Sequence, residues 1–180
     1  EETGVLLFDA DGDRDLDLYL VRGGAQYPSE TPEYQDVLCV NDGKGHFTLA
    51  PEALPQETAC GKTVKAADFD GDGDLDLFVG GSMFPRKYPK PDRSFLLRND
   101  GQGSDNPRFT DITEQYCPAL AHVGMVSDAL WTDFDGDKRP DLLLAGEWMP
   151  LTFLRNTGNR LENITAQTGI AKEIGWWSCL

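Results

Sequence analysis

The stretch Asp68-Phe-Asp-Gly-Asp-Gly-Asp-Leu-Asp-Leu-Phe-Val79 places aspartates on alternate residues and then runs into an apolar, strand-like segment. Carboxylates this close together repel one another, because a like charge about 4–6 Å away disfavours the ionised form. A hard cation would remove that repulsion. The stretch therefore predicts a cation-holding loop that leads directly into a β-strand.

The same arrangement occurs three times, with aspartate runs that begin at Asp9, Asp68 and Asp133. Each run is followed by a strand-like segment, a third strand closed by a turn, and a short fourth strand. The second strands are expected at 16–21, 75–79 and 142–145, the third strands with their turns at 37–43, 95–101 and 152–158, and the fourth at 46–49, 108–112 and 160–164. Glycine-led strands at 61–67 and 124–131 precede the later runs. A similar lead-in at 175–180 predicts that the chain stops just before another copy.

Four short antiparallel strands in a repeat of this length predict the blades of a β-propeller. We expect an all-β fold: one β-propeller segment, residues 1–180, of about three four-stranded antiparallel blades in an incomplete ring. The blade units are approximately 5–60, 61–123 and 124–180. Propellers close with four to eight blades. Either the full protein supplies the remaining blades, or the open blade ends pair with another copy of the chain.

Calcium is the cation that fits these loops best, because it takes 6–8 oxygen ligands in a flexible cage. Only the register that starts at Asp9, Asp68 and Asp133 puts aspartate at the first, third, fifth and ninth positions of every run. We expect side-chain ligands from those positions and a backbone carbonyl ligand from the seventh. The predicted ligands are Asp9, Asp11, Asp13, Asp15 and Asp17 in the first loop, Asp68, Asp70, Asp72, Asp74 and Asp76 in the second, and Asp133, Asp135, Asp137, Arg139 and Asp141 in the third. A helix–loop–helix calcium site is excluded, because the twelfth position carries no glutamate and a strand follows.

The motifs DADGDRDLDL at 9–18, DFDGDGDLDL at 68–77 and DFDGDKRPDL at 133–142 resemble the FG-GAP/VCBS repeats of integrin α-subunit propellers and of secreted bacterial proteins. Together with details such as GEWMP at 146–150, they are most similar to Bacteroidetes-type VCBS-repeat surface proteins. The resemblance covers essentially the whole chain. It implies up to three calcium ions, each in the hairpin loop between the first two strands of a blade.

The family favours glycine at the sixth loop position, where this chain has Arg14, Gly73 and Lys138. A residue other than glycine costs about 1–2 kcal/mol there if the backbone is left-handed. Lys138 also places a positive charge beside the cation. We therefore expect the second site to bind calcium most tightly and the third most weakly.

The net charge of −15 comes largely from these loops, since the three runs hold fourteen aspartates and the rest of the chain is nearly neutral. With no basic stripe, we expect no nucleic-acid binding, and with no long apolar stretch we expect no membrane span. Four cysteines without a CxxC pair do not predict a disulfide scaffold or zinc site. The two histidines, His46 and His122, form no recognisable nucleophile–base pattern with serine or cysteine.

These observations predict a calcium-stabilised extracellular binding or adhesion module that is not an enzyme. The alternatives are the propeller part of a secreted polysaccharide-acting enzyme such as a lyase, or a purely structural spacer. We expect the protein to be secreted, periplasmic or on the cell surface, because weak calcium sites fill where calcium is near millimolar.

The connections after the second strands, 25–34, 82–92 and 147–150, are rich in aromatic residues. Equivalent loops of stacked blades emerge on one face, and aromatic residues and arginine are the side chains that binding hot spots use. The aromatic residues and the arginine of these connections are hypothesised to form a recognition surface for an unknown protein or glycan ligand. The alternative is that they fold over their own blades. The residues concerned are Tyr27, Tyr34, Phe84, Arg86, Tyr88, Trp148 and Met149.

Overall fold

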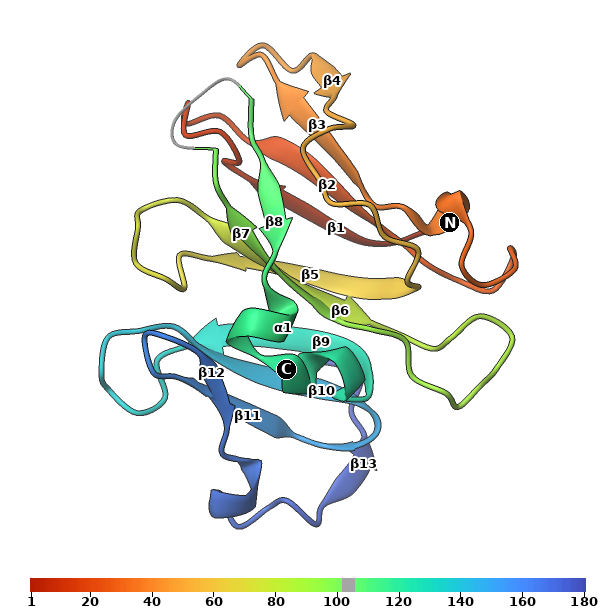
Figure 1. Cartoon of the computed structure of the whole chain (residues 1–180), viewed down its shortest axis with the longest axis vertical. Coiled ribbons are helices and arrows are strands. Elements are labelled where there is room, and N and C mark those ends of the chain that lie inside the picture. The colour runs from red at the N-terminus through yellow and green to blue at the C-terminus, as the bar shows by residue number, and fades with distance from the viewer. Residues whose placement is uncertain (102–105) are drawn as a thin grey trace.

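The computed structural model describes residues 1–101 and 106–180, and these form three antiparallel sheets that follow one another along the chain (Figure 1). The first sheet has the order β1 (Glu2–Phe8), β2 (Asp17–Arg22), β3 (Val37–Asn41) and β4 (Phe47–Leu49). The second has β5 (Gly61–Ala67), β6 (Asp76–Gly81), β7 (Phe95–Asn99) and β8 (Phe109–Asp111). The third has β9 (Met125–Thr132), β10 (Asp141–Pro150), β11 (Thr152–Asn156) and β12 (Leu161–Asn163), joined by a fifth strand, β13 (Ile174–Trp176).

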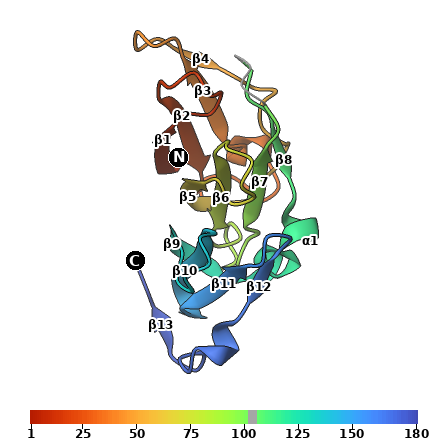
Figure 2. The same cartoon turned by 90° about the vertical axis from the view of Figure 1, so that its left-hand side faces the viewer.

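The sheets are stacked as the blades of a propeller are, with the first strand of each sheet beside the first strand of the next. β5 contacts both β1 and β9, and the turned view shows the three sheets succeeding one another along the long axis (Figure 2). Within residues 1–101 and 106–180, helical structure is limited to α1 (Thr113–Tyr116) and the short 3₁₀ turns η1 (Pro32–Tyr34), η2 (Pro118–His122) and η3 (Thr165–Gln167). The prediction of an all-β, incomplete propeller-like segment is confirmed.

Each aspartate run lies in the hairpin loop between the first two strands of its sheet. The pairing of Phe8 with Asp17 closes the first loop, Ala67 with Asp76 the second, and Thr132 with Asp141 the third. In all three hairpins the closing pair joins the residue before the run to the ninth position of the run. The repeat seen in the sequence is thus a repeat of strand register.

Two apolar layers hold the sheets together, and strand β6 contributes to both. Leu77 and Val79 face the layer between the first and second sheets, whereas Phe78 faces the layer between the second and third. Successive strand residues point to opposite faces, and every residue of β6 is buried. A strand that is buried on both faces explains the nearly continuous apolar sequence of this segment.

Two expectations for the end of the chain are wrong. Glu147–Pro150 is not a loop, because β10 continues through it with a change of register at Trp148, whose φ is 59°. The lead-in at 175–180 does not open a new sheet, since β13 pairs with this late part of β10. β11 pairs with β10 only at residues 142–144, so the backbone groups farther along β10 are free to pair with β13.

In the described parts of the chain, no helix is both long and apolar enough to span a bilayer.

Candidate metal centre

The backbone of each hairpin loop is held by hydrogen bonds to the carboxylates of the same loop. In each loop the first aspartate accepts the backbone N–H groups of the fourth and sixth residues, at 2.7 Å and 3.0–3.1 Å. The aspartate at position three accepts the N–H of the residue at position five at 3.2 Å. The aspartate at position five accepts the N–H of the residue at position seven at 2.9–3.0 Å. Such side-chain-to-backbone bonds are the usual reason for aspartate in tight turns. The carboxylates are thereby turned toward the inside of each loop.

The ninth aspartate of each loop, Asp17, Asp76 or Asp141, is completely buried and joins the loop to the third strand of its sheet. Asp76 accepts the N–H of Phe69 at 3.3 Å and the N–H of Asn99 at 2.8 Å. Asp17 and Asp141 make the same pair of bonds in their own repeats. Burial raises the pKa of Asp76 to about 7, against the lowering effect of the Asn99 N–H. A buried carboxyl group with a raised pKa lacks a compensating positive charge.

Carboxylate oxygens converge in every loop to within 4.8 Å of one another. The aspartates at loop positions one and three belong to every group. The remaining member is the aspartate at position five in the first loop and the aspartate at position nine in the other two. The groups are Asp9, Asp11 and Asp13; Asp68, Asp70 and Asp76; and Asp133, Asp135 and Asp141. The structure therefore brings nine predicted ligands together in three clusters. The side chains of Asp17, Asp72 and Asp137 lie outside these groups, and the carbonyl ligands at Asp15, Asp74 and Arg139 stay a prediction.

The donor set of these loops fits calcium. It is made of oxygen atoms alone, as a hard cation requires. Burial, followed by the charges of its aspartate neighbours, raises the pKa of Asp11 to about 6 despite the N–H of Asp13. In the same loop, Oδ1 of Asp15 is buried and accepts no hydrogen bond from the described residues. Both observations indicate negative charge that no cationic side chain of the described residues compensates, and a divalent cation would compensate it.

The backbone at the sixth position is left-handed in all three loops. This meets the condition under which a residue other than glycine is unfavourable there. Its φ is 77° at Arg14, 102° at Gly73 and 72° at Lys138. The fourth position is also left-handed and is glycine in every copy. Only the second loop thus has glycine wherever the backbone favours it.

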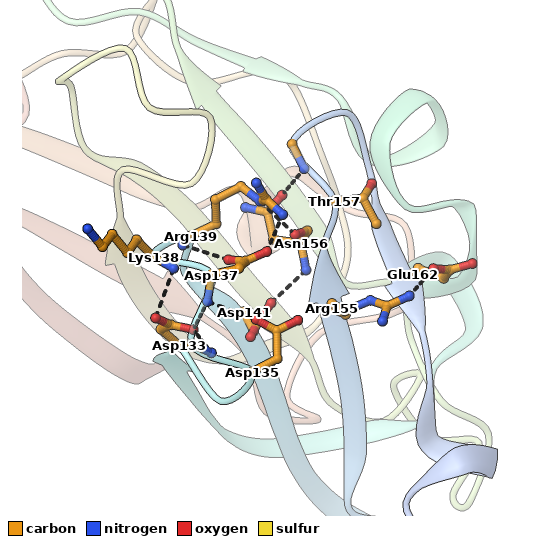
Figure 3. Close-up of polar contacts among 12 residues, drawn as sticks. Asp133, Asp135, Asp137, Lys138, Arg139, Asp141, Arg155, Asn156, Thr157 and Glu162 are labelled. Atoms are coloured by element: carbon orange, nitrogen blue, oxygen red, sulfur yellow. Dashed lines mark hydrogen bonds and ion pairs between the residues drawn. The ribbon is translucent and has the colours of Figure 1, made fainter.

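The third loop contains a cation of its own, the guanidinium group of Arg139 (Figure 3). It forms an ion pair with Asp137, and its Nε donates to the carbonyl oxygen of Asn156 at 3.0 Å. This pairing adds a positive charge beside Asp137, which lies outside the third cluster as Asp72 lies outside the second. Sequence reasoning considered only the backbone carbonyl of Arg139. The signal that it missed was an arginine where the other two loops have aspartate.

A second set of residues that sequence reasoning missed is Asn41, Asn99 and Asn156, one at the end of each third strand. These asparagines lie where the third strands enter their turns, and their side-chain oxygens accept N–H groups of the turn glycines. Their backbone N–H groups donate in addition to the ninth aspartates of the loops. Recurrence at the same place in three copies was the available signal, but turn chemistry explained that recurrence equally well.

Residues 9–79 match the family model of the FG-GAP-like repeat. This segment is an FG-GAP-like repeat. It spans the first aspartate loop, strands β2 to β5, the second loop and the first part of β6, and the third loop repeats the same hairpin register. None of the curated proteins compared with the chain matches it. The FG-GAP/VCBS-like resemblance seen in the motifs is confirmed at the level of the repeat family.

The hypothesised recognition surface is only partly exposed. Tyr34 and Met149 are buried, so their assignment to a surface is wrong. Tyr34 lies beneath its own loop, where its hydroxyl donates to the carbonyl oxygen of Tyr27 at 3.0 Å. Met149 belongs to the apolar layer between the second and third sheets, because it continues strand β10.

Three of the remaining residues, Arg86, Tyr88 and Trp148, link neighbouring repeats. The indole Nε1 of Trp148 donates to the hydroxyl oxygen of Tyr88 at 2.7 Å, and Arg86 donates to the carbonyl oxygen of Gln26 at 3.0 Å. Tyr88 and Trp148 are 50% and 60% exposed. The connections after the second strands therefore do lie on one side of the stack, as expected for equivalent loops.

Proposed function

We propose that this protein is a calcium-stabilised extracellular binding module, in which one calcium ion holds the aspartate loop of each FG-GAP-like repeat. The observation that carries the proposal is the convergence of three carboxylate oxygens within 4.8 Å in each of three equivalent loops. FG-GAP repeats are often calcium-binding. In each loop the first and third aspartates, with the fifth or ninth, would hold the ion. The ion would supply positive charge to a site that otherwise has only negative charge.

The role of the metal is structural in this proposal. The loops connect the first strand, which contacts the first strand of the neighbouring sheet, to the second strand, which contributes side chains to the apolar layers. A loop held by a cation fixes the register of this hairpin, and a loop whose carboxylates repel one another opposes it. The protein is thus proposed to reach full stability only where calcium is abundant. This supports a secreted, periplasmic or surface location.

The proposed activity is binding rather than catalysis. The exposed side chains of Tyr27, Tyr88 and Trp148, with Arg86, form the candidate contact surface for a protein or glycan. Large aromatic side chains held by hydrogen bonds lose little conformational freedom on binding, which favours this use. Alanine at both Tyr88 and Trp148 is expected to abolish binding to any partner that uses the surface, without lowering the melting temperature in calcium.

The experiment that tests the metal is thermal unfolding of the full chain in millimolar calcium and in excess chelator. A site filled at about 100 times its Kd adds about 2.7 kcal/mol to the free energy of unfolding. The melting temperature should rise with calcium, and less with magnesium, which prefers fewer and more regularly placed ligands. Asp70→Asn should reduce the rise, whereas Glu33→Gln, an exposed acid outside the loops, should leave it unchanged. Equal melting temperatures in calcium and chelator would refute the proposal.

A further inference from the structure

Two buried asparagine side chains cross from one repeat to the loop of the preceding repeat. Nδ2 of Asn99 donates to the carbonyl oxygen of Ala10 at 2.9 Å, and Nδ2 of Asn156 donates to that of Phe69 at 2.7 Å. Ala10 and Phe69 are the second residues of the first and second aspartate loops. Each therefore lies directly between two aspartates of a carboxylate cluster. A bond that fixes this peptide fixes the backbone that presents both carboxylates.

The same asparagines are also bound to the loops of their own repeats. The backbone N–H of Asn99 donates to Oδ1 of Asp76 at 2.8 Å, and that of Asn156 donates to Oδ1 of Asp141 at 2.7 Å. Nδ2 of Asn156 donates in addition to the carbonyl oxygen of Pro140, the eighth loop residue, at 3.1 Å. Each asparagine thus contacts two loops at once, with little freedom to adopt another rotamer.

Joined end to end, these bonds make a continuous path through the three loops. Every residue on the path is at most 5% exposed, so the bonds are shielded from water and costly to break. The path runs through Asp17, Ala10, Asn99, Asp76, Phe69, Asn156 and Asp141.

We propose that Asn99 and Asn156 are positioning residues that couple the calcium sites of neighbouring repeats. The inference rests on the proposed function, since it concerns the same three loops. When one loop is ordered by its ion, the asparagine that it holds is already placed to order the adjacent loop. By linkage, the adjacent loop then binds calcium more tightly, and the effect is equal in both directions.

The first repeat supplies a built-in control. Asn41 occupies the same position as Asn99 and Asn156, but among the described residues its Nδ2 donates only to the carbonyl oxygen of Leu16 in its own loop, at 3.2 Å. Its side-chain oxygen accepts the N–H of Gly45 in the following turn, just as the side-chain oxygens of Asn99 and Asn156 accept the N–H groups of their turn glycines. Asn41→Ala therefore removes the local bonds without removing a bond between repeats.

The test is a calcium titration of the ¹⁵N-labelled full chain, in which each loop is followed separately by NMR. Gly12, Gly71 and Gly136 report on the three loops, because the N–H of each donates to the first aspartate of its loop at 2.7 Å. Loss of one buried hydrogen bond corresponds to about a five- to tenfold weaker Kd. Asn99→Ala should weaken calcium binding by that factor in the first and second loops and affect the third much less, only through the weaker second site. Asn156→Ala should weaken the second and third by that factor and affect the first much less, whereas Asn41→Ala should act chiefly on the first.

A second measurement keeps the asparagines intact and covers the case in which an alanine variant does not fold. Asp70→Asn disables the second loop and should weaken calcium binding at the Gly12 and Gly136 loops as well. Unchanged binding at both would overturn the coupling, as would an Asn99→Ala effect confined to the second loop. If instead no glycine signal responds to calcium in the unsubstituted protein, the proposed function fails rather than the coupling.

Discussion

Glycine at the sixth loop position should stabilise the first and third repeats. Arg14 and Lys138 are exposed there with φ values of 77° and 72°, a backbone region that costs a residue with a Cβ about 1–2 kcal/mol. Glycine avoids this cost but loses about 0.5–1 kcal/mol through the greater freedom of the unfolded chain. Each replacement should therefore raise the free energy of unfolding by about 0.5–1 kcal/mol. The two positions lie in different repeats, so the double variant should gain about twice as much if the repeats contribute independently.

The assay is urea unfolding in millimolar calcium, with thermal melting as a second measure. A gain of 1 kcal/mol corresponds to about 2–4 °C in a chain of this size. Lys138→Ala is the matched control, because it removes the positive charge beside the predicted metal but keeps the Cβ. The backbone effect is therefore the difference in unfolding free energy between Lys138→Gly and Lys138→Ala.

The reverse substitution at the second loop completes the test. A Cβ added at Gly73 meets no atom within 4 Å, so Gly73→Ala changes only the backbone preference and should cost about 1 kcal/mol. Should Lys138→Gly prove no more stable than Lys138→Ala, with Gly73→Ala also neutral, the reasoning from left-handed backbone would be refuted. A gain shared equally by the glycine and alanine variants would assign the effect to charge instead.

Three further results are expected. Arg139→Ala frees Asp137 from its ion pair and should tighten calcium binding in the third loop several-fold, as read at Gly136, while Arg160→Ala, which removes an exposed ion pair with Glu162, should not. Burial raises the pKa of Glu57 to about 7 from an unfolded value near 4.5. Because the folded state binds the proton more tightly, the free energy of unfolding should fall as pH rises from about 4.5 to about 7. Glu57→Gln should flatten this slope in urea titrations at saturating calcium, and an unaltered slope would contradict the assignment. Leu142→Ala, in the centre of the layer between the second and third sheets, should cost about 2–5 kcal/mol in urea unfolding, with Leu130→Ala, 46% exposed on the same sheet, as the milder control.

The hairpins and their loops could be predicted from the sequence because one local pattern determines both. Alternating aspartates demand a tight turn around a cation, and the apolar run after them demands a strand, so loop and register arise from the same dozen residues. Three copies in phase then predict the blades. The sixth position differs, since the expectation of glycine there came from the family resemblance and the left-handed backbone was only its condition, which the φ values now meet.

The contacts between repeats could not be predicted, because local sequence does not determine them. Asn99 reaches Ala10 across 89 residues of chain, and nothing in the turn that follows Asn99 distinguishes this role from turn formation. Trp148 and Met149 show a related limit. They were assigned together to a surface loop, but a shift of register in β10 exposes Trp148 and buries Met149. A change of one residue in strand register exchanges the two faces.

The middle repeat combines the features that the other two lack. Its loop has glycine at the sixth position and aspartate at the seventh, whereas the third loop has Lys138 and Arg139. Its second strand is buried on both faces, and its loop is bound by both Asn99 and Asn156. If the coupling holds, calcium bound at this loop raises the affinity of both neighbours, by a factor that 1 kcal/mol of coupling sets at about fivefold. The outer loops then fill at lower calcium concentrations than their own sequences would allow. The third site, which we expect to be weakened by its arginine and lysine, should then bind calcium more tightly once the second site is filled. Titrating the Gly136 loop in the Asp70→Asn background separates the two contributions.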